Sequence, residues 1–325
     1  MKNHFSLILK NCLFILVGIL CACAVGEALI RLGTSNQDNY VIEMWRYAKL
    51  LKKQSENDAV GHEHIPNKRA TLQHVDVDIN DLGMRGPMPD PSVPHRVALI
   101  GDSLVFGWGV EDKHTMRGYL SRLLPDSIDV VNAGVGNMNL NQSVSHWLDL
   151  SQKVNADMLV VYVTPRAASK MQEDNCGWLV RNSRLAAISS TFFRQLKSGA
   201  YGENKLIEEY RHMWTGPQGR DVLTHAFEKL STYQKAYGCR IVIVSIPETH
   251  DFNNYQFPFM AETAGFFARK YGFPFIDALP LLQGPPTKSF WVSERDIHLN
   301  GKAFQLISSA LEKMILEAYE NTTRS

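Results

Sequence analysis

Short apolar runs alternate with amphipathic stretches along most of the chain, and this alternation predicts the fold class. From Arg96 onward the apolar runs resemble strands that are buried on both faces, and the stretches between them have helical spacing. The expected strands are RVALI (96–100), one run within 126–134, ADMLVVYVT (156–164), CRIVIVSIP (239–247) and FPFIDA (273–278). The expected helices are 139–154, 219–238, 261–272 and 299–320. Strands that alternate with helices indicate an α/β domain with a parallel sheet.

The N-terminus has a different pattern, because residues 11–26 carry no charge and apolar residues extend this run on both sides. A bilayer core requires roughly 20 apolar residues in a helix, so the run is just long enough. Lys2 and Lys10 on the short flank favour an N-terminus that stays inside, with the rest of the chain exported. We expect residues 1–33 to be an uncleaved signal-anchor, that is, a transmembrane helix. Removal as a signal peptide and lipidation at a cysteine are the alternatives.

Polar segments separate this anchor from the periodic part of the chain. Residues 34–94 are interpreted as a stalk with a helical patch at 41–54, followed by a lead-in loop rich in proline, glycine and asparagine. The α/β domain is expected over 95–320. Within it, the polar and irregular segment 165–215 follows the third strand. Two interpretations of this insert stay open, a lid over a cleft and a surface loop.

Composition narrows the function classes. The chain has 325 residues, of which 45% are hydrophobic and 21% charged, and this suits one globular domain with attachments. A formal net charge of +1 lacks the basic excess that nucleic-acid binding requires, so we expect no nucleic-acid partner. Only Cys176 and Cys239 lie outside the apolar N-terminus, and no CxxC occurs, so neither metal nor dithiol chemistry is indicated. These two cysteines form either a bridge or two unrelated thiols.

A candidate nucleophile stands at the end of the first expected strand, in Gly101-Asp102-Ser103. In an open parallel sheet, ligands bind beyond the carboxyl ends of the strands, and Ser103 lies at that edge. A serine there attacks an acyl carbon once a base removes its proton. Gly-Asp-Ser by itself is equally an ordinary turn sequence.

The candidate base comes from the last connection, SERDIHLNGKAF (293–304). His298 is the usual kind of proton acceptor near neutral pH, and a carboxylate such as Asp296 holds its tautomer and stabilises its charged form. Two-residue spacing in a loop lets both side chains face one cleft. The alternative is that Asp296 caps a turn and His298 is a surface histidine.

Several blocks in this order resemble the SGNH (GDSL) hydrolase family over roughly residues 79–318. The blocks are INDLGMRGP, RVALIGDSLVFGWGV, VNAGVGNMNLNQ and RDIHLNGKAF. The resemblance implies a three-layer α/β/α sandwich of the flavodoxin-like SGNH type, with Ser103 as nucleophile, His298 as general base and Asp296 as the carboxylate that orients it. Many members have that carboxylate three residues before the histidine, where this chain has Arg295, so Glu294 is a second candidate.

Two departures from the family pattern concern the oxyanion hole. The resemblance implies donors from the serine N–H, a second-block glycine N–H and a third-block asparagine. Here Asn137 stands where that glycine belongs, with Gly136 before it. The third block is TPRAAS, with Arg166 at the asparagine position. Three roles for Arg166 stay open: replacing the missing donor, binding an anionic part of the substrate, or pointing to solvent.

The sequence therefore predicts a serine esterase or deacylase that needs no metal or organic cofactor. Its expected substrate is an O-acyl group, above all O-acetyl, on a carbohydrate or lipid of the cell envelope. The expected location is a single-pass membrane protein with its catalytic domain in the periplasm or outside the cell. An O-acyltransferase with the same triad, and a domain that binds a glycan or partner with little turnover, are the alternatives.

Overall fold

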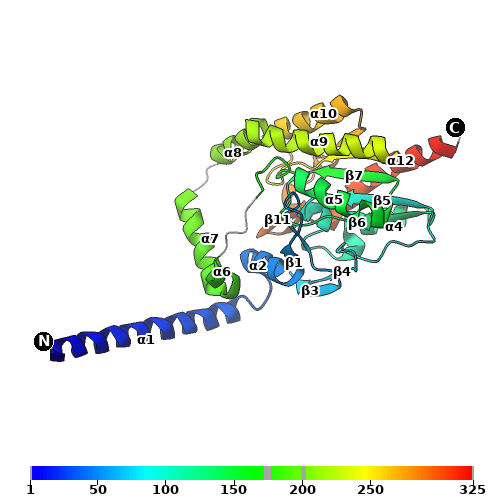
Figure 1. Cartoon of the computed structure of the whole chain (residues 1–325). Coiled ribbons are helices and arrows are strands. Elements are labelled where there is room, and N and C mark those ends of the chain that lie inside the picture. Colours follow the sequence, from blue (N-terminus) through cyan, green and yellow to red (C-terminus); the bar gives the residue numbers. More distant parts are fainter. Residues whose placement is uncertain (1, 172–176, 199–202, 324–325) are drawn as a thin grey trace. The chain divides into compact units, whose positions relative to one another are not determined.

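The computed structural model describes residues 2–171, 177–198 and 203–323 (Figure 1). The chain divides into two compact units, Met1–Lys49 with Asp174–Ala200, and Leu50–Glu173 with Tyr201–Ser325. The N-terminal helix and the α/β domain therefore belong to different units. The segment expected as an insert at 165–215 is shared between the two units, and both interpretations of it, a lid and a surface loop, stay predictions.

A five-stranded parallel sheet forms the centre of the larger unit, in the order β6-β5-β7-β8-β9. Its strands are β5 (His95–Ile100), β6 (Ile128–Asn132), β7 (Met158–Val163), β8 (Arg240–Ser245) and β9 (Phe275–Asp277). Along β7, alternate residues belong to two different apolar clusters, one on each face of the sheet. Strands that are apolar on both faces must be covered by helices on both sides.

Helices complete the two outer layers. One apolar cluster includes residues of α5 (Leu140–Val154), α8 (Glu203–Thr215), α9 (Pro217–Tyr237) and α10 (Pro258–Tyr271), and the other includes residues of α4 (Met116–Leu123) and α12 (Gly301–Thr323). The connections contain α3 (Ser103–Phe106), α11 (Leu279–Leu282), η1 (Asp112–His114) and η2 (Thr287–Phe290). The predicted α/β/α sandwich with a parallel sheet is confirmed, and each of the four expected helices is present.

Residues 52–79 differ from the expected stalk and loop, because they form two antiparallel hairpins in the larger unit. These are β1 (Lys52–Gln54) with β2 (His62–His64), and β3 (Lys68–Leu72) with β4 (Val75–Ile79). The alternation of valine, aspartate and isoleucine in β4 is a two-residue period that indicates a half-buried strand. Gln73 and His74 link β3 to β4 with φ values of 47° and 63°, as a two-residue type I′ turn requires.

The last connection is also more regular than expected. It forms a short hairpin of β10 (Trp291–Ser293) and β11 (Asp296–Leu299) before α12 begins.

The smaller unit contains α1 (Lys2–Gly33), most of α2 (Tyr40–Leu51), α6 (Trp178–Asn182) and α7 (Arg184–Ser198). Within the described part of the chain, α1 is the one helix long and apolar enough to cross a membrane, a test that a signal sequence also passes. Cys176 lies outside the described residues and Cys239 is buried, so the proposed pairing of these cysteines stays untested.

Candidate active site

Ser103 begins α3 directly after β5, where the chain turns sharply. A side chain at Gly101 would place its Cβ 2.6 Å from Val105, so only glycine fits this bend. The buried carboxylate of Asp102 accepts hydrogen bonds from the Leu104 N–H at 3.0 Å and from the Thr164 hydroxyl at 2.7 Å. Asp102 thus caps the turn and ties it to the loop after β7. Burial raises the pKa of Asp102, although these two hydrogen bonds act against that effect.

Ser103, His298 and Asp296 lie together at the carboxyl edge of β5. The Ser103 Oγ is 2.9 Å from His298 Nε2, and His298 Nδ1 is 2.6 Å from Asp296 Oδ1. Residues two apart on a strand point to the same side, so β11 presents both its carboxylate and its imidazole to the serine. With the Nδ1 proton on the Asp296 side, Nε2 is placed to accept a hydrogen bond from the serine hydroxyl. Glu294, the second candidate carboxylate, is exposed.

Asp296 is held by more than His298. Its Oδ2 accepts hydrogen bonds from Trp108 Nε1 and from Gln73 Nε2, both at 2.7 Å. Burial by itself raises the pKa of Asp296, but hydrogen bonds from His298 and Gln73, together with the charge of His298, bring that pKa below its ordinary value. The arrangement therefore keeps the carboxylate ionised at neutral pH.

Sequence reasoning identified neither Gln73 nor Trp108 as a partner of Asp296. Gln73 lies 223 positions before Asp296 and reaches it from the β3–β4 turn. Gly109 leaves room for this approach, because a Cβ there would lie 2.6 Å from Gln73 Oε1. No local motif marks such a partner. The one sequence signal was the alternating pattern of β4, which predicts a hairpin but not where its tip docks.

The loop after β6 carries the second-block candidates. Gly134 lets this loop approach the nucleophile turn, since a Cβ there would lie 2.4 Å from the Phe106 nitrogen. The Gly136 carbonyl accepts hydrogen bonds from Lys52 Nζ at 3.2 Å and from His62 Nε2 at 3.0 Å. This carbonyl belongs to the same peptide as the Asn137 N–H, and in a trans peptide the two groups point in opposite directions. The β1–β2 hairpin therefore fixes the direction of the Asn137 N–H.

The loop after β7 carries Arg166, whose side chain is exposed. The backbone of this loop is anchored at carbonyls on both sides of Arg166: Pro165 accepts a hydrogen bond from Trp214 Nε1, and Ala167 accepts one from the Leu140 N–H. The positive charge of Arg166 is among the smaller influences that oppose the burial-driven rise in the pKa of Asp102, so the guanidinium lies within electrostatic range of the nucleophile turn. Arg166 is thus a solvent-facing cation on a fixed backbone.

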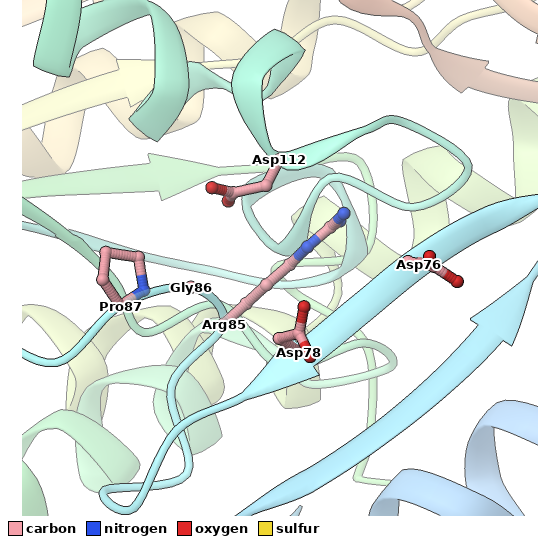
Figure 2. A pocket seen from close by; sticks show the side chains of 6 residues that line it. All are labelled: Asp76, Asp78, Arg85, Gly86, Pro87 and Asp112. Carbon is pink, nitrogen blue, oxygen red and sulfur yellow. The ribbon is translucent and has the colours of Figure 1, made fainter.

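A pocket of about 300 Å³ lies apart from the predicted site residues, none of which lines it. Its lining is Asp76, Asp78, Arg85, Gly86, Pro87 and Asp112 (Figure 2). The buried Arg85 donates hydrogen bonds to the carbonyls of Phe106, Gly107 and Val110 and so supports the loop from Phe106 to Val110. Its role in this structure is to hold that loop. In the described ranges, no cluster of three or more His, Cys, Asp or Glu side chains is placed to hold a metal ion.

No protein-family model and no curated protein matches the sequence. Among solved structures, similar chains include one described as a lipolytic protein of the G-D-S-L family from Desulfitobacterium hafniense, with 13% identity, a TM-score of 0.42 and coverage of 67% of this chain and 98% of that one. A carbohydrate acetylesterase family member from Sinorhizobium meliloti has 15% identity, a TM-score of 0.41 and coverage of 68% and 97%.

A lipase/acylhydrolase from Enterococcus faecalis has 12% identity, a TM-score of 0.42 and coverage of 68% and 95%. These neighbours have names of the kind that the sequence blocks suggest, but at such identities and TM-scores they say nothing of the substrate of this chain.

Proposed function

We propose that this chain is a membrane-anchored serine hydrolase of the SGNH (GDSL) type that acts on ester bonds. The observation that carries the proposal is the continuous hydrogen-bond relay from Ser103 through His298 to Asp296 at the carboxyl edge of the sheet. A nucleophile within hydrogen-bond reach of a base, with the base oriented by a third group, is the arrangement that activates a serine hydroxyl.

In the first half of the reaction, Ser103 Oγ attacks the acyl carbon while His298 Nε2 takes the hydroxyl proton. Asp296 stabilises the imidazolium, which then gives the proton to the departing alcohol as the ester bond breaks. This leaves an acyl-enzyme on Ser103. In the second half, His298 takes a proton from water, the hydroxide equivalent attacks the acyl carbon, and Ser103 receives the proton as the acid leaves.

The negative charge on the attacked oxygen needs donors, and we assign this role to the backbone N–H groups of Ser103 and Asn137, with Gly136 shaping the loop. The hydrogen bonds from Lys52 and His62 to the Gly136 carbonyl support the assignment of Asn137, because they orient the peptide that links Gly136 to Asn137. Arg166 is assigned to substrate binding, since its exposed guanidinium suits an anionic or polar part of the substrate. An oxyanion hole with these two donors lacks the third donor of the family pattern. One such donor typically contributes a factor of about 10²–10³ to kcat.

The substrate class is inferred from the expected location of the catalytic unit. We propose O-acyl groups, above all O-acetyl, on a glycan or lipid of the cell envelope, reached by a catalytic unit exported behind α1. Lys2 and Lys10 on the short N-terminal flank support this orientation. Protease added to intact and to opened cells tests it: the catalytic unit should be cut in cells whose outer barrier alone has been removed.

A fluorophosphonate probe and a small acetyl ester test the activity of the purified chain. The wild type should label covalently and release acetate, whereas Ser103→Ala should do neither. Absence of both reactions in a folded wild-type protein would contradict the proposal. It would favour a domain that binds glycan or a partner protein, a candidate that the arginine at the third-block position supports.

An O-acyltransferase would use the same acyl-enzyme, with a sugar hydroxyl in place of water. The two reactions are separated by supplying an acetyl donor with and without a glycan acceptor. A hydrolase forms free acetate at the same rate in both cases, whereas a transferase forms acetylated glycan at the expense of acetate.

A further inference from the structure

The smaller unit exposes a group of large apolar side chains outside α1. They lie on α6 and α7, with exposed fractions of 74% for Trp178, 64% for Leu179, 55% for Phe192, 61% for Phe193 and 60% for Leu196. Phe192 and Phe193 contact each other edge to face, with ring centroids 6.0 Å apart. The two helices contact each other, and exposed aromatic and aliphatic side chains gathered on neighbouring helices mark a surface that binds another apolar phase. We call these five residues the α6–α7 apolar surface.

This surface is tied to the end of α1 by the carboxylate of Glu27. That carboxylate accepts hydrogen bonds from Ser183 Oγ at 2.7 Å and from the Leu185 N–H at 3.0 Å, and so caps the start of α7. Glu27 is the first charged residue after the uncharged run 11–26. If that run lies in the hydrocarbon core, Glu27 lies at the head-group level, and α7 starts at the same level.

Two further contacts hold the segment at this level. Arg184 donates a hydrogen bond to the Thr34 hydroxyl at 2.9 Å, just after α1 ends. Trp45 of α2 donates one from its indole nitrogen to the Val180 carbonyl at 2.7 Å. The α6–α7 segment is therefore joined to the anchor at several points within one compact unit.

The charge of the segment matches an anionic surface. Residues 177–198 contain Arg181, Arg184, Arg194 and Lys197, and no aspartate or glutamate. Helices that lie in the membrane interface combine basic residues with tryptophan, phenylalanine and leucine in this way. Tryptophan in particular is enriched where the bilayer meets water.

We propose that the α6–α7 apolar surface lies in the head-group region of the bilayer that holds α1, with its basic residues against anionic lipid. This rests on the anchor in the proposed function, but not on the esterase activity. The bilayer fits better than a lid or a second copy, because the segment is hydrogen-bonded to the end of the apolar helix and all its charged residues are basic.

Photo-cross-linking in the full chain tests the proposal. Benzoylphenylalanine replaces Phe192 in one sample and Phe266 in another, and each is reconstituted in vesicles of phosphatidylethanolamine and phosphatidylglycerol. Phe266 is a matched control, because it is 54% exposed and lies on α10 of the other unit. We expect lipid adducts, detected by mass spectrometry, at position 192 and several-fold fewer at position 266.

Other adducts would overturn the proposal. Cross-links from position 192 to the α/β unit would show that the segment covers that unit as a lid, and cross-links to a second copy would show a dimer interface. Equal lipid adducts at both positions would show that labelling is non-specific. As a second measurement, Arg181→Gln with Arg194→Gln should lower the adduct yield in anionic vesicles but not in phosphatidylcholine.

Each supporting assumption is measured in the same samples. Carbonate extraction reports whether α1 holds the chain in the membrane, and loss of the chain there would overturn both the anchor and this surface. Hydrolysis of a soluble acetyl ester reports on Ser103 independently. An inactive protein that still forms lipid adducts at position 192 would contradict only the proposed enzyme activity.

Discussion

The two halves of the candidate site are built differently. On the proton-transfer side, Ser103, His298 and Asp296 form direct side-chain hydrogen bonds, and Asp296 is buried under additional donors. On the oxyanion side, the assigned donors are backbone N–H groups, and the cation at the third-block position, Arg166, is exposed.

In the proposed reaction, this difference separates two tasks of catalysis. The proton relay is assembled in advance by segments that lie far apart in the chain, so its geometry does not depend on a substrate. Stabilisation of the oxyanion depends on how firmly the Gly136–Asn137 peptide is held. It also depends on whether the substrate has an anionic or polar group that binds Arg166. We therefore expect large, uniform losses from changes in the relay, and smaller, substrate-dependent losses from changes around the oxyanion side.

Removing the nucleophile should have the largest effect. Ser103→Ala leaves the base without a partner, and we expect kcat for a small acetyl ester to fall by on the order of 10⁴–10⁶, as when the nucleophile of comparable enzymes is removed. The measurement is initial rate together with fluorophosphonate labelling. An unchanged thermal midpoint separates this loss from misfolding, and retained labelling would refute the assignment of Ser103.

Neutralising the carboxylate should cost nearly as much. Asp296→Asn leaves the shape of the site but favours the wrong imidazole tautomer, and we expect kcat to fall by about 10³–10⁴. Glu294→Gln is the matched control, because this neighbouring carboxylate is exposed and should leave kcat unchanged. Equal losses in the two variants would show that Asp296 is not the orienting carboxylate.

Loosening the oxyanion peptide should have an intermediate effect. Lys52→Met removes one of the two donors to the Gly136 carbonyl, and we expect kcat to fall about tenfold with little change in KM, a fraction of what losing a whole oxyanion donor costs. Lys53→Met is the control, since Lys53 forms an exposed ion pair with Glu63 instead. A KM effect without a kcat effect would point to substrate binding at Lys52.

Weakening the hydrogen bond from Gln73 to Asp296 should change the pH profile of the activity more than its maximal rate. Asparagine tolerates the positive φ of this turn position, so Gln73→Asn leaves the backbone in place. Its side chain is one carbon shorter, so Asp296 loses the hydrogen bond from the amide, and the pKa of Asp296 rises toward its ordinary value. The active form has this carboxylate ionised, and its contribution is lost as pH falls through the pKa. We therefore expect the acidic limb of kcat/KM to move to higher pH.

His74→Asn is the control for the Gln73 variant, because it changes the other residue of the same turn and also tolerates positive φ. It should leave the acidic limb in place. An identical shift in both variants would mean that the turn, and not the Gln73 amide, determines the profile.

Changing Arg166 should have the smallest effect on a neutral substrate. For an uncharged acetyl ester, Arg166→Ala should lower kcat/KM by less than about fivefold, because an exposed charge contributes roughly 0–1 kcal/mol. The comparison substrate is an ester with a carboxylate near the acyl group, for which the loss should be larger. A loss of about 10²–10³ with the neutral ester would instead identify Arg166 as an oxyanion donor.

The candidate site was only partly predictable from the sequence. Ser103 was recognisable because it follows a buried strand, where parallel sheets place their ligands, and His298 with Asp296 because both occupy the last connection. Arg166 was recognisable as a departure, but its exposure was not. Gln73, Lys52 and His62 carried no signal, because each acts through a contact with a segment remote in the chain.

The order of strands and helices, the class of fold and the choice of Ser103, His298 and Asp296 as candidates followed from the sequence itself, because hydrophobic periodicity and residue type are local properties. The tertiary structure decided which side chains brace that relay. Gln73 reaches Asp296 only because a tight turn at positive φ docks over Gly109, and Lys52 reaches the Gly136 carbonyl only because a short hairpin packs beside the loop after β6. Such contacts depend on register and packing between distant segments, which no local pattern encodes.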